Sequence, residues 1–215
     1  MAAGEVQLVT LGGEGEARYA HLAPDLIRAT GPVSYNYQFG TGGLLERLVA
    51  ASWSTPDTLF CAACTTGAVE NDDLIGIELG FPGADFYAFK ANLAPLAALL
   101  IERGHATADE LAGLVTRARK ASYLNAYVPD DVYYLHALST LPRRRGRGVG
   151  KALLQAAITR ARAAGFRELH LDVLADNPAV GFYEAMGLQV LAEIRSPELT
   201  REHGFPAEYR MAVAL

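Results

Sequence analysis

The stretch Leu135–Ile158, LHALSTLPRRRGRGVGKALLQAAI, places five of the chain's nineteen Lys and Arg residues within positions 143–151. An apolar run precedes this basic, glycine-rich segment, and a run with helical periodicity follows it. A turn between a strand and a helix leaves backbone N–H groups free at the positive end of the helix dipole. Glycines let the backbone close around a phosphate without side-chain obstruction. The segment therefore predicts a site for a small, multiply charged anion.

Two common phosphate-binding patterns do not fit this segment. A Walker A loop ends in Gly-Lys-Ser/Thr, whereas Lys151 is followed by alanine. The dinucleotide fingerprint G-x-G-x-x-G fails because Gly146, Gly148 and Gly150 alternate strictly, and no acidic residue follows at the usual distance. A third pattern, Arg/Gln-x-x-Gly-x-Gly/Ala, fits Arg145 and the last two of these glycines.

Length and composition limit the classes of protein. The 215 residues suit a single domain (1–215), and 51% hydrophobic with 20% charged residues is ordinary for a protein with a packed core. A net charge of -5 argues against a general nucleic-acid binder, which needs a broad basic surface. No signal peptide is evident at the N-terminus, and the apolar run 93–101 is too short to span a membrane. We therefore expect a cytoplasmic protein without a membrane partner.

The only two cysteines, Cys61 and Cys64, form a C-x-x-C motif inside the apolar run TLFCAACTT. Zinc would need a second pair of ligands, and none is spaced for it, so the sequence predicts no metal site. We interpret both cysteines as small buried hydrophobic residues. Two cysteines also give no disulfide framework, which fits a reducing compartment.

Strand and helix patterns fill the rest of the chain, without repeats or linkers. Apolar runs predict strands at 5–11, 58–66, 74–81, 131–141, 166–176, 188–196 and 208–215. The helical period predicts helices at 16–30, 44–52, 86–104, 107–124, 149–165 and 178–187. The aromatic segment 33–43 is expected as a loop and 67–73 as a polar turn, and Thr107 with Glu110 predicts a capping box. The whole predicts an α+β fold with a mixed sheet of about seven strands.

The order of strand, glycine-rich loop, helix, strand LHLDVLADNPAV and helix FYEAMGL resembles the GNAT superfamily of N-acetyltransferases. The resemblance is specific over about residues 132–191 and only topological before that. It implies a mostly antiparallel sheet flanked by helices, and acetyl-CoA as the co-substrate. The helical stretch 84–130 lies between strands three and four, where the family has a short turn, so we interpret it as an insertion. This insertion could cover the acceptor site or form a homodimer contact.

The resemblance also implies which residues bind acetyl-CoA. The loop amides would hold the pyrophosphate, and the strand before the loop would separate from its neighbour and bind the pantetheine arm with its free backbone groups. The amide of Leu138 is the expected donor to the thioester carbonyl. Arg143, Arg144 and Lys151 could reach the ribose phosphate. The implied set is Leu138, Ser139, Thr140, Arg143, Arg144, Arg145, Gly146, Arg147, Gly148, Val149, Gly150, Lys151, Asn177 and Phe182.

Tyr183 matches the family tyrosine that protonates the departing thiolate. The competing interpretation is an aromatic core residue on an amphipathic helix, a role that suits its neighbour Phe182. The family usually separates its asparagine from this tyrosine by seven positions, whereas Asn177 and Tyr183 differ by six. This departure affects the expected cofactor contact of Asn177 more than the role of Tyr183.

Two residues are candidates for the general base. On a strand, Tyr134, His136, Leu138 and Thr140 would share one face, which puts His136 two residues from the carbonyl-binding amide. An imidazole with an ordinary pKa of about 6.5 can accept protons at neutral pH. The segment LHAL is similar to the same strand of serotonin (arylalkylamine) N-acetyltransferases, where the histidine is implicated in deprotonating the amine. A core histidine is nearly as good an interpretation, and Glu78 in LIGIELGF is the rival base or a buried hydrogen-bond partner.

The expected function is transfer of an acetyl group from acetyl-CoA to a primary amine, by direct attack on the thioester. Tyr35, Tyr37 and Phe39 would line the acceptor site, where aromatic rings suit a flat or cationic small-molecule amine. The sequence does not separate an arylalkylamine from a polyamine, an antibiotic, an amino acid or a protein N-terminus. The alternative is a sensor that binds CoA or acyl-CoA without turnover.

Overall fold

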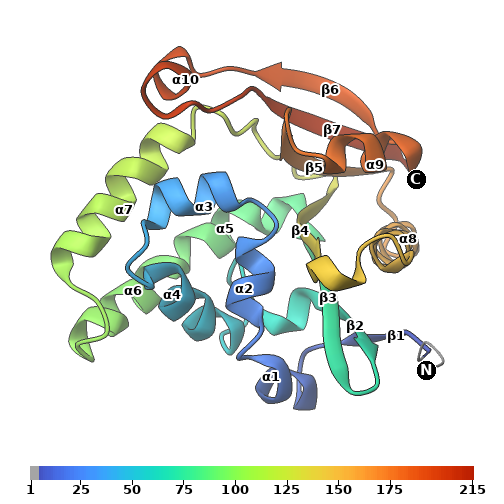
Figure 1. The fold of residues 1–215 in the computed structure, drawn as a ribbon, viewed down its shortest axis with the longest axis horizontal. Helices are drawn as coiled ribbons and strands as arrows, with labels where there is room; N and C mark the ends of the chain where they lie inside the picture. Colours follow the sequence, from blue (N-terminus) through green and yellow to red (C-terminus); the bar gives the residue numbers. More distant parts are fainter. Residues whose placement is uncertain (1–4) are drawn as a thin grey trace.

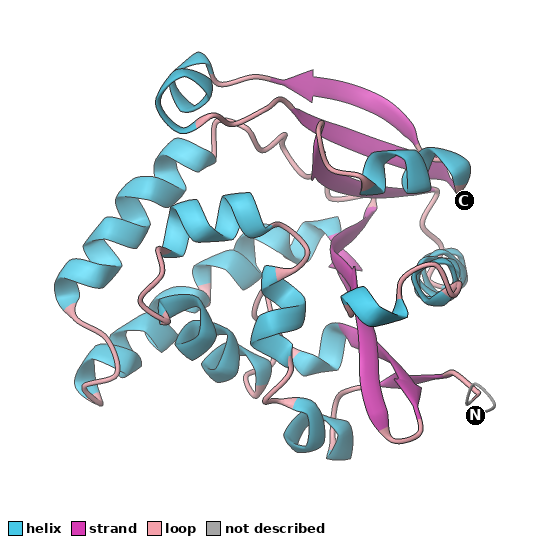
Figure 2. Ribbon diagram, viewed as in Figure 1, coloured by secondary structure: helices cyan, strands magenta, loops and turns pink. Residues whose placement is uncertain are grey.

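The computed structural model describes residues 5–215 and contains one mixed sheet (Figures 1 and 2). Its seven strands run in the order β1-β2-β3-β4-β5-β7-β6. Every neighbouring pair is antiparallel except β4 and β5, which are parallel. The sequence-based expectation of a mostly antiparallel mixed sheet is confirmed. The strands are β1 (Gln7–Thr10), β2 (Thr65–Glu70), β3 (Asp73–Pro82), β4 (Tyr133–Thr140), β5 (Glu168–Leu174), β6 (Gln189–Ile194) and β7 (Glu208–Ala214).

Helices cover both faces of the sheet (Figure 1). Helix α8 (Val149–Ala163) packs on one face of β2, β3 and β4, while α2 (Ala23–Arg28) contacts β4 from the opposite side. The largest buried cluster joins the N-terminal helices, α5 and α6 to one face of β3 and β4, and the next largest lies between α8 and the other face of the sheet. The other helices are α1 (Glu14–Tyr19), α3 (Pro32–Phe39), α4 (Leu44–Trp53), α5 (Phe86–Ala91), α6 (Leu93–Glu102), α7 (Ala108–Ala121), α9 (Ala179–Ala185) and α10 (Pro197–His203).

The helical insertion expected at 84–130 is present between β3 and β4 as α5, α6 and α7. The predicted capping box is also present, because the Thr107 hydroxyl accepts from the Glu110 amide and the Glu110 carboxylate accepts from the Thr107 amide. Residues Gly83–Glu102 are long and apolar enough to span a membrane, by length and composition alone. This differs from the sequence-based expectation. In the fold this segment is divided into a 3₁₀ turn (Gly83–Asp85), α5 and α6.

Several local predictions were wrong. The helix expected at 16–30 is two helices, since Pro24 fits only in the first turn of α2. The loop expected at 33–43 is largely α3, which starts at Pro32 and packs against α7. Helix α10 was missed altogether.

The strand expected at 58–66 begins only at Thr65, and a 3₁₀ turn (Ala62–Cys64) precedes it. Cys61 is buried and Cys64 is half-buried, with 2.9 Å between their Sγ atoms. The hydrogen bond between the two thiols lowers the pKa of Cys61 to about 7, so this pair is more polar than the predicted small buried hydrophobic residues. The polar turn expected at 67–73 consists only of Asn71 and Asp72. Both have positive φ, as a tight two-residue turn requires.

Candidate functional site

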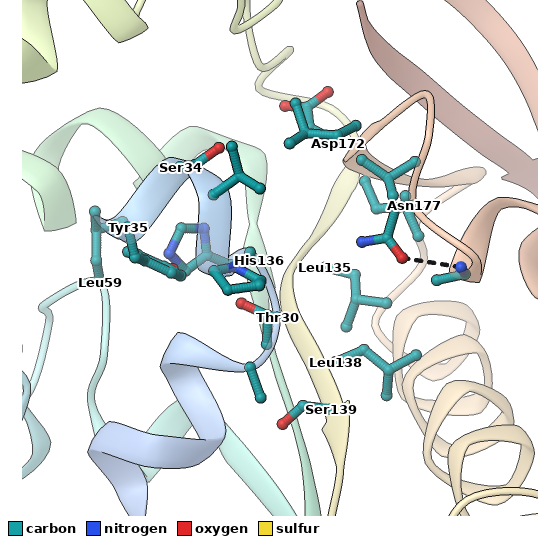
Figure 3. A pocket seen from close by; sticks show the side chains of 18 of the residues that line it. Thr30, Ser34, Tyr35, Leu59, Leu135, His136, Leu138, Ser139, Asp172 and Asn177 are labelled. Carbon is teal, nitrogen blue, oxygen red and sulfur yellow. Dashed lines mark hydrogen bonds between the residues drawn. The ribbon is translucent and has the colours of Figure 1, made fainter. Parts of the chain in front are cut away.

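One cavity of about 1390 Å³ runs between the two halves of the molecule (Figure 3). This volume exceeds the roughly 300–1,000 Å³ common for small-molecule sites, so it can hold more than one reactant. Its walls come from β4, the glycine-rich loop, β5 and α9 on one side, and from α3, α5, α6 and α7 on the other. Figure 3 shows Tyr35, His136 and Thr30 on one side of β4, and Leu135, Leu138 and Asn177 on its other side.

Strands β4 and β5 separate within the cavity wall. They pair only at Tyr133–Leu169 and Tyr134–His170. Beyond Tyr134 the backbone edge of β4 that faces β5 has no strand partner, although the strand continues to Thr140. Unpaired backbone N–H and C=O groups in such a gap can bind an extended amide-containing chain. The separation expected from the family resemblance is therefore present.

The glycine-rich loop presents backbone donors to the same cavity. In the part of the chain that the structure describes, no acceptor is bonded to the amides of residues 146–151, and the first bond of the helix runs from Ala152 to the Gly148 carbonyl. Gly146 and Gly148 have φ of 74° and 81°, a region that favours glycine. A Cβ at either position would meet no atom within 4 Å, so conformation rather than crowding selects glycine here. Six free amides at a helix start fit a pyrophosphate group.

The arginines of the loop are divided between two tasks. Arg144 and Arg147 form ion pairs of 2.7 and 2.8 Å with Glu70, a carboxylate only 1% exposed at the end of β2. Arg145 and Lys151 line the cavity without an ion-pair partner among the described residues. Arg143 and Arg147 do not line it, contrary to their expected cofactor contact, and Arg144 lines it while tied to Glu70. No local pattern indicates Glu70, since a carboxylate at a strand end is usually solvated.

Helix α9 closes the cavity beside the loop. Tyr183 and Phe182 both line it, with ring centroids 5.3 Å apart, and burial raises the pKa of the Tyr183 hydroxyl well above its usual value. Asn177 also lines the cavity, but its Oδ1 accepts from the Ala179 amide at 2.9 Å. Its side-chain oxygen therefore caps the helix. The other predicted cofactor contacts on the cavity wall are Leu138, Ser139, Thr140, Gly146, Gly148, Val149 and Gly150.

A β-bulge in β4 changes which side chains share a face. Ala137 pairs with Leu79 and Leu135 with Gly80, which leaves His136 without a partner on β3. The extra residue reverses the alternation of side chains beyond it. Leu138 then packs on the α8 side, while the Ser139 hydroxyl donates to the Leu26 carbonyl of α2 at 2.7 Å. The prediction that Tyr134, His136, Leu138 and Thr140 share one face was therefore wrong.

The bulge places His136 among aromatic rings on the acceptor side of the sheet. The ring centroids of Phe60, Phe81, Tyr134 and Phe86 lie 5.7, 5.9, 6.1 and 6.2 Å from its own. Burial, with a smaller effect of the Lys90 charge, lowers its pKa to about 4. His136 is thus neutral at pH 7, and its buried Nε2 has no hydrogen-bond partner among the described residues. The ordinary imidazole pKa of about 6.5, on which its candidacy as the base rested, therefore does not hold for His136.

Glu78, the rival base, does not line the cavity. It pairs with Leu138 across the strands, so it lies on the α8 face, fully buried and ion-paired with Arg160. Tyr133 also binds this arginine, through its hydroxyl at 2.7 Å from Nη2. Burial raises the pKa of Glu78, and the Arg160 charge opposes the rise. The geometry favours the alternative of a buried structural partner.

Two of the three predicted acceptor residues line the cavity. Tyr35 and Phe39 lie one turn apart on α3, with ring centroids 6.1 Å apart. Tyr37 points elsewhere and packs on His203 and Phe205. In an extended loop all three could have shared a face, but in a helix the middle residue turns away. Their assignment as a loop caused the error.

Sequence reasoning missed an acidic group on the acceptor wall. Asp172 on β5 and Glu208 on β7 both line the cavity. Arg210 binds both oxygens of Asp172, at 2.5 and 2.9 Å, and the Tyr134 hydroxyl donates to the same carboxylate. The alternation of β5, HLDVL, puts Asp172 on the face opposite Leu171 and Val173 and could have indicated it, whereas nothing local marks Glu208.

Comparison with known proteins is consistent with this architecture. The model of the acetyltransferase (GNAT) family matches residues 51–188, well over half of the chain. The chain belongs to the GNAT acetyltransferase family. It is therefore an acetyltransferase, of a fold that uses acetyl-CoA. A search of curated proteins found no match to this sequence.

Solved GNAT structures resemble the chain over nearly its whole length. An N-acetyltransferase from Staphylococcus aureus Mu50 is 13% identical with a TM-score of 0.67, over 91% of this chain and 95% of that one. A mosquito arylalkylamine N-acetyltransferase like 5b is 14% identical with a TM-score of 0.60, over 98% and 100%. A chain of the NatC complex bound to Gag peptide and CoA is 15% identical with a TM-score of 0.55, over 98% and 99%. At sequence identities this low, the structural likeness shows a common fold alone.

Proposed function

We propose that this acetyltransferase moves the acetyl group of acetyl-CoA to a primary amine, by direct attack of the amine on the thioester. One observation carries the proposal: five of the six residues with free amides at 146–151, all except Arg147, line the same cavity as the unpaired edge of β4 and the acceptor wall. A pyrophosphate on those amides sends its pantetheine arm along β4. The acyl end then reaches the acceptor side of the sheet.

The chemistry supplied by acetyl-CoA is an activated acyl carbon with a good leaving group. The residues of this chain supply polarisation and proton transfer. We assign the Leu138 amide to the thioester carbonyl oxygen, where a fixed donor stabilises the charge that develops on that oxygen. An ammonium substrate loses one proton before attack and a second as the C–N bond forms, while the sulfur gains one as the C–S bond breaks.

Tyr183 is the proposed donor to the sulfur. Its raised pKa keeps the hydroxyl protonated at neutral pH, and the same apolar surroundings raise the pKa of a departing thiolate. His136 is the proposed acceptor of the proton lost as the C–N bond forms. An imidazole with a pKa of about 4 is too weak to deprotonate an alkylammonium of pKa about 10 directly. His136 therefore acts on an amine that has already lost its first proton.

Thiol release from acetyl-CoA in the presence of a panel of primary amines tests this function. We expect release that depends on both the enzyme and the amine, with a matching amount of N-acetylated product. CoA binding, measured separately by calorimetry, distinguishes the alternative. Binding without thiol release from any amine would identify a sensor of CoA or acyl-CoA and would contradict the enzyme assignment.

A further inference from the structure

The acceptor half of the cavity contains an apolar chamber between α3, α6 and α7. Every cavity-lining residue from α6 and α7 is apolar. These walls include Leu93, Ala97, Ile101, Leu111, Leu114 and Ala118. Helix α3 adds the rings of Tyr35 and Phe39 to these walls, together with the polar side chains of Ser34 and Gln38. Apolar walls of this extent favour a guest that removes apolar surface from water, at about 25 cal/mol for each Å² that it buries.

A carboxylate without a partner lies in another part of the same cavity wall. Arg210 donates to Asp172 and to the backbone carbonyls of Tyr127 and Ala126, the latter two at 2.8 and 3.0 Å. Glu208 forms no hydrogen bond or ion pair through its side chain within residues 5–215. Asp172, Arg210 and an ionised Glu208 together carry one negative charge that nothing in this cluster balances.

We propose that the acceptor is an amphiphilic amine, whose ammonium group binds Glu208 and whose apolar body occupies the chamber between α3, α6 and α7. This inference rests on the proposed function and names the substrate class of the same site. A polyamine or a polar amino acid would leave the chamber walls unburied. A hydrophobic molecule without a cation would leave the Glu208 carboxyl without a polar partner.

The surroundings of Glu208 also suit removal of the first proton. Burial and the charge of Asp172, partly opposed by Arg210, raise the pKa of Glu208 to about 8. Tyr134 and Asp176 are further titratable groups that line the cavity, and the Tyr134 hydroxyl is engaged with Asp172. Proton transfer from an alkylammonium of pKa about 10 to this carboxylate is unfavourable by roughly a hundredfold. Transfer to His136 is unfavourable by about a millionfold. Lys90, a cavity residue of α5, disfavours the ammonium at its own end.

A longer acyl chain on CoA is the competing occupant of the chamber. An acyl chain would satisfy the apolar walls, but it brings no positive charge to Glu208. The amine proposal explains both features with one molecule. The two occupants give different results when chain length is varied on one reactant at a time.

The test compares n-propylamine, n-hexylamine and n-decylamine with acetyl-CoA, because these amines share a pKa and differ in apolar length. We expect kcat/KM to rise at least tenfold from propyl to hexyl, since each buried methylene contributes about 0.8 kcal/mol, or roughly fourfold. Ala97→Phe, which fills the chamber, should lower kcat/KM for decylamine at least tenfold and for propylamine much less. The control Ala112→Phe adds the same ring to an exposed position of α7 outside the cavity.

Glu208→Gln tests the ammonium site. We expect kcat/KM for hexylamine to fall at least tenfold, and the limb of its pH profile near pH 8 to disappear, while the affinity for CoA stays unchanged. Glu193→Gln, on an exposed carboxylate of β6, should change neither. The unfolding temperature of each variant shows whether the fold is retained.

Three results would overturn the inference: equal kcat/KM along the amine series, an unchanged Glu208→Gln profile, or a preference for octanoyl-CoA that Ala97→Phe abolishes. Calorimetric binding of decylamine to the enzyme with CoA separates this inference from the proposed function. If decylamine binds and both variants weaken it although no amine is acetylated, the site is right and the reaction is wrong. If propylamine is acetylated but decylamine does not bind, the reaction stands and the site is wrong.

Discussion

The cofactor half and the acceptor half of this cavity are built in different ways. The cofactor half consists largely of backbone: six amides at the start of α8 and the unpaired edge of β4. The acceptor half consists of side chains, chiefly the apolar faces of α3, α6 and α7. A site made of backbone needs glycines at fixed spacings, because only they reach the required conformation. A site made of apolar side chains leaves no motif, since the same residues would equally serve a core.

Strand β4 belongs to both halves and shows how they are joined. The bulge at His136 aims that imidazole at the acceptor, while Leu138, two residues later, faces α8. One inserted residue therefore lets a single strand serve cofactor and acceptor. We therefore expect that substitutions can alter the two halves separately.

Tyr183→Phe should give the largest effect, on turnover. The substitution removes the hydroxyl, while the ring still packs in the buried cluster between α8 and the sheet. General acid catalysis is worth about a hundredfold to ten-thousandfold, so kcat should fall within that range while the affinity for CoA stays nearly constant. Tyr209→Phe removes a hydroxyl outside the cavity and serves as the control. An unchanged kcat would mean that solvent protonates the thiolate or that chemistry is not rate-limiting.

His136 should make stability depend on pH from the acceptor half. Its pKa is about 4 in the folded protein and about 6.5 when unfolded, so between these values the unfolded chain binds more protons. This contribution is fully present above pH 6.5 and is lost as the pH falls toward 4, by up to about 3 kcal/mol.

Urea unfolding of His136→Gln between pH 4.5 and 7.5 checks this dependence, which the substitution should flatten. His105→Gln, at an exposed histidine in the loop before α7, should keep it. Equal slopes for the wild type and His136→Gln would show that the imidazole is not held neutral by its aromatic surroundings.

Tyr35 and Tyr37 should give the smallest and most selective difference. Tyr35→Ala opens the acceptor wall and should raise KM for the amine by a few-fold to about tenfold, in line with about 0.5–1.5 kcal/mol for an aromatic contact. Tyr37→Ala loses its packing on Phe205 and should lower stability instead. Steady-state kinetics and thermal unfolding of both variants check this. An equal rise in the KM of Tyr35→Ala and of Tyr37→Ala would mean that α3 does not present a single face to the substrate.

Sequence reasoning reached the cofactor half more completely than the acceptor half. The alternating glycines and the strand before them follow from local spacing, Tyr183 follows from the family resemblance, and the structure brings them to one cavity. The ion pairs of Glu70 with Arg144 and Arg147 join residues more than 70 positions apart, which no local pattern reports. The bulge at His136 was equally hidden, because it depends on how β3 and β4 pair.

Predictions for the acceptor half were wrong where tertiary packing overrode a local structural preference. Segment 33–43, rich in glycine and aromatic residues, indicated a loop, yet Arg117 of α7 donates to the Gln38 carbonyl at the end of α3. Contacts from a distant helix stabilise a helix that the segment alone does not favour. Glu208 was missed for a similar reason, since β7 places it beside Asp172 only once the sheet has formed.

Calorimetric titration of CoA into Gly148→Asp tests the central claim most directly. Gly148 has φ of 81° and opens α8, so an aspartate there adds strain and a negative charge where the amides would hold the pyrophosphate. Gly165→Asp, with φ of 85° at the other end of the helix, carries similar strain and the same charge away from the cavity. We predict that Gly148→Asp binds CoA at least a hundredfold more weakly while Gly165→Asp binds it normally. Equal affinities for the two variants would contradict the assignment of the loop amides to the cofactor.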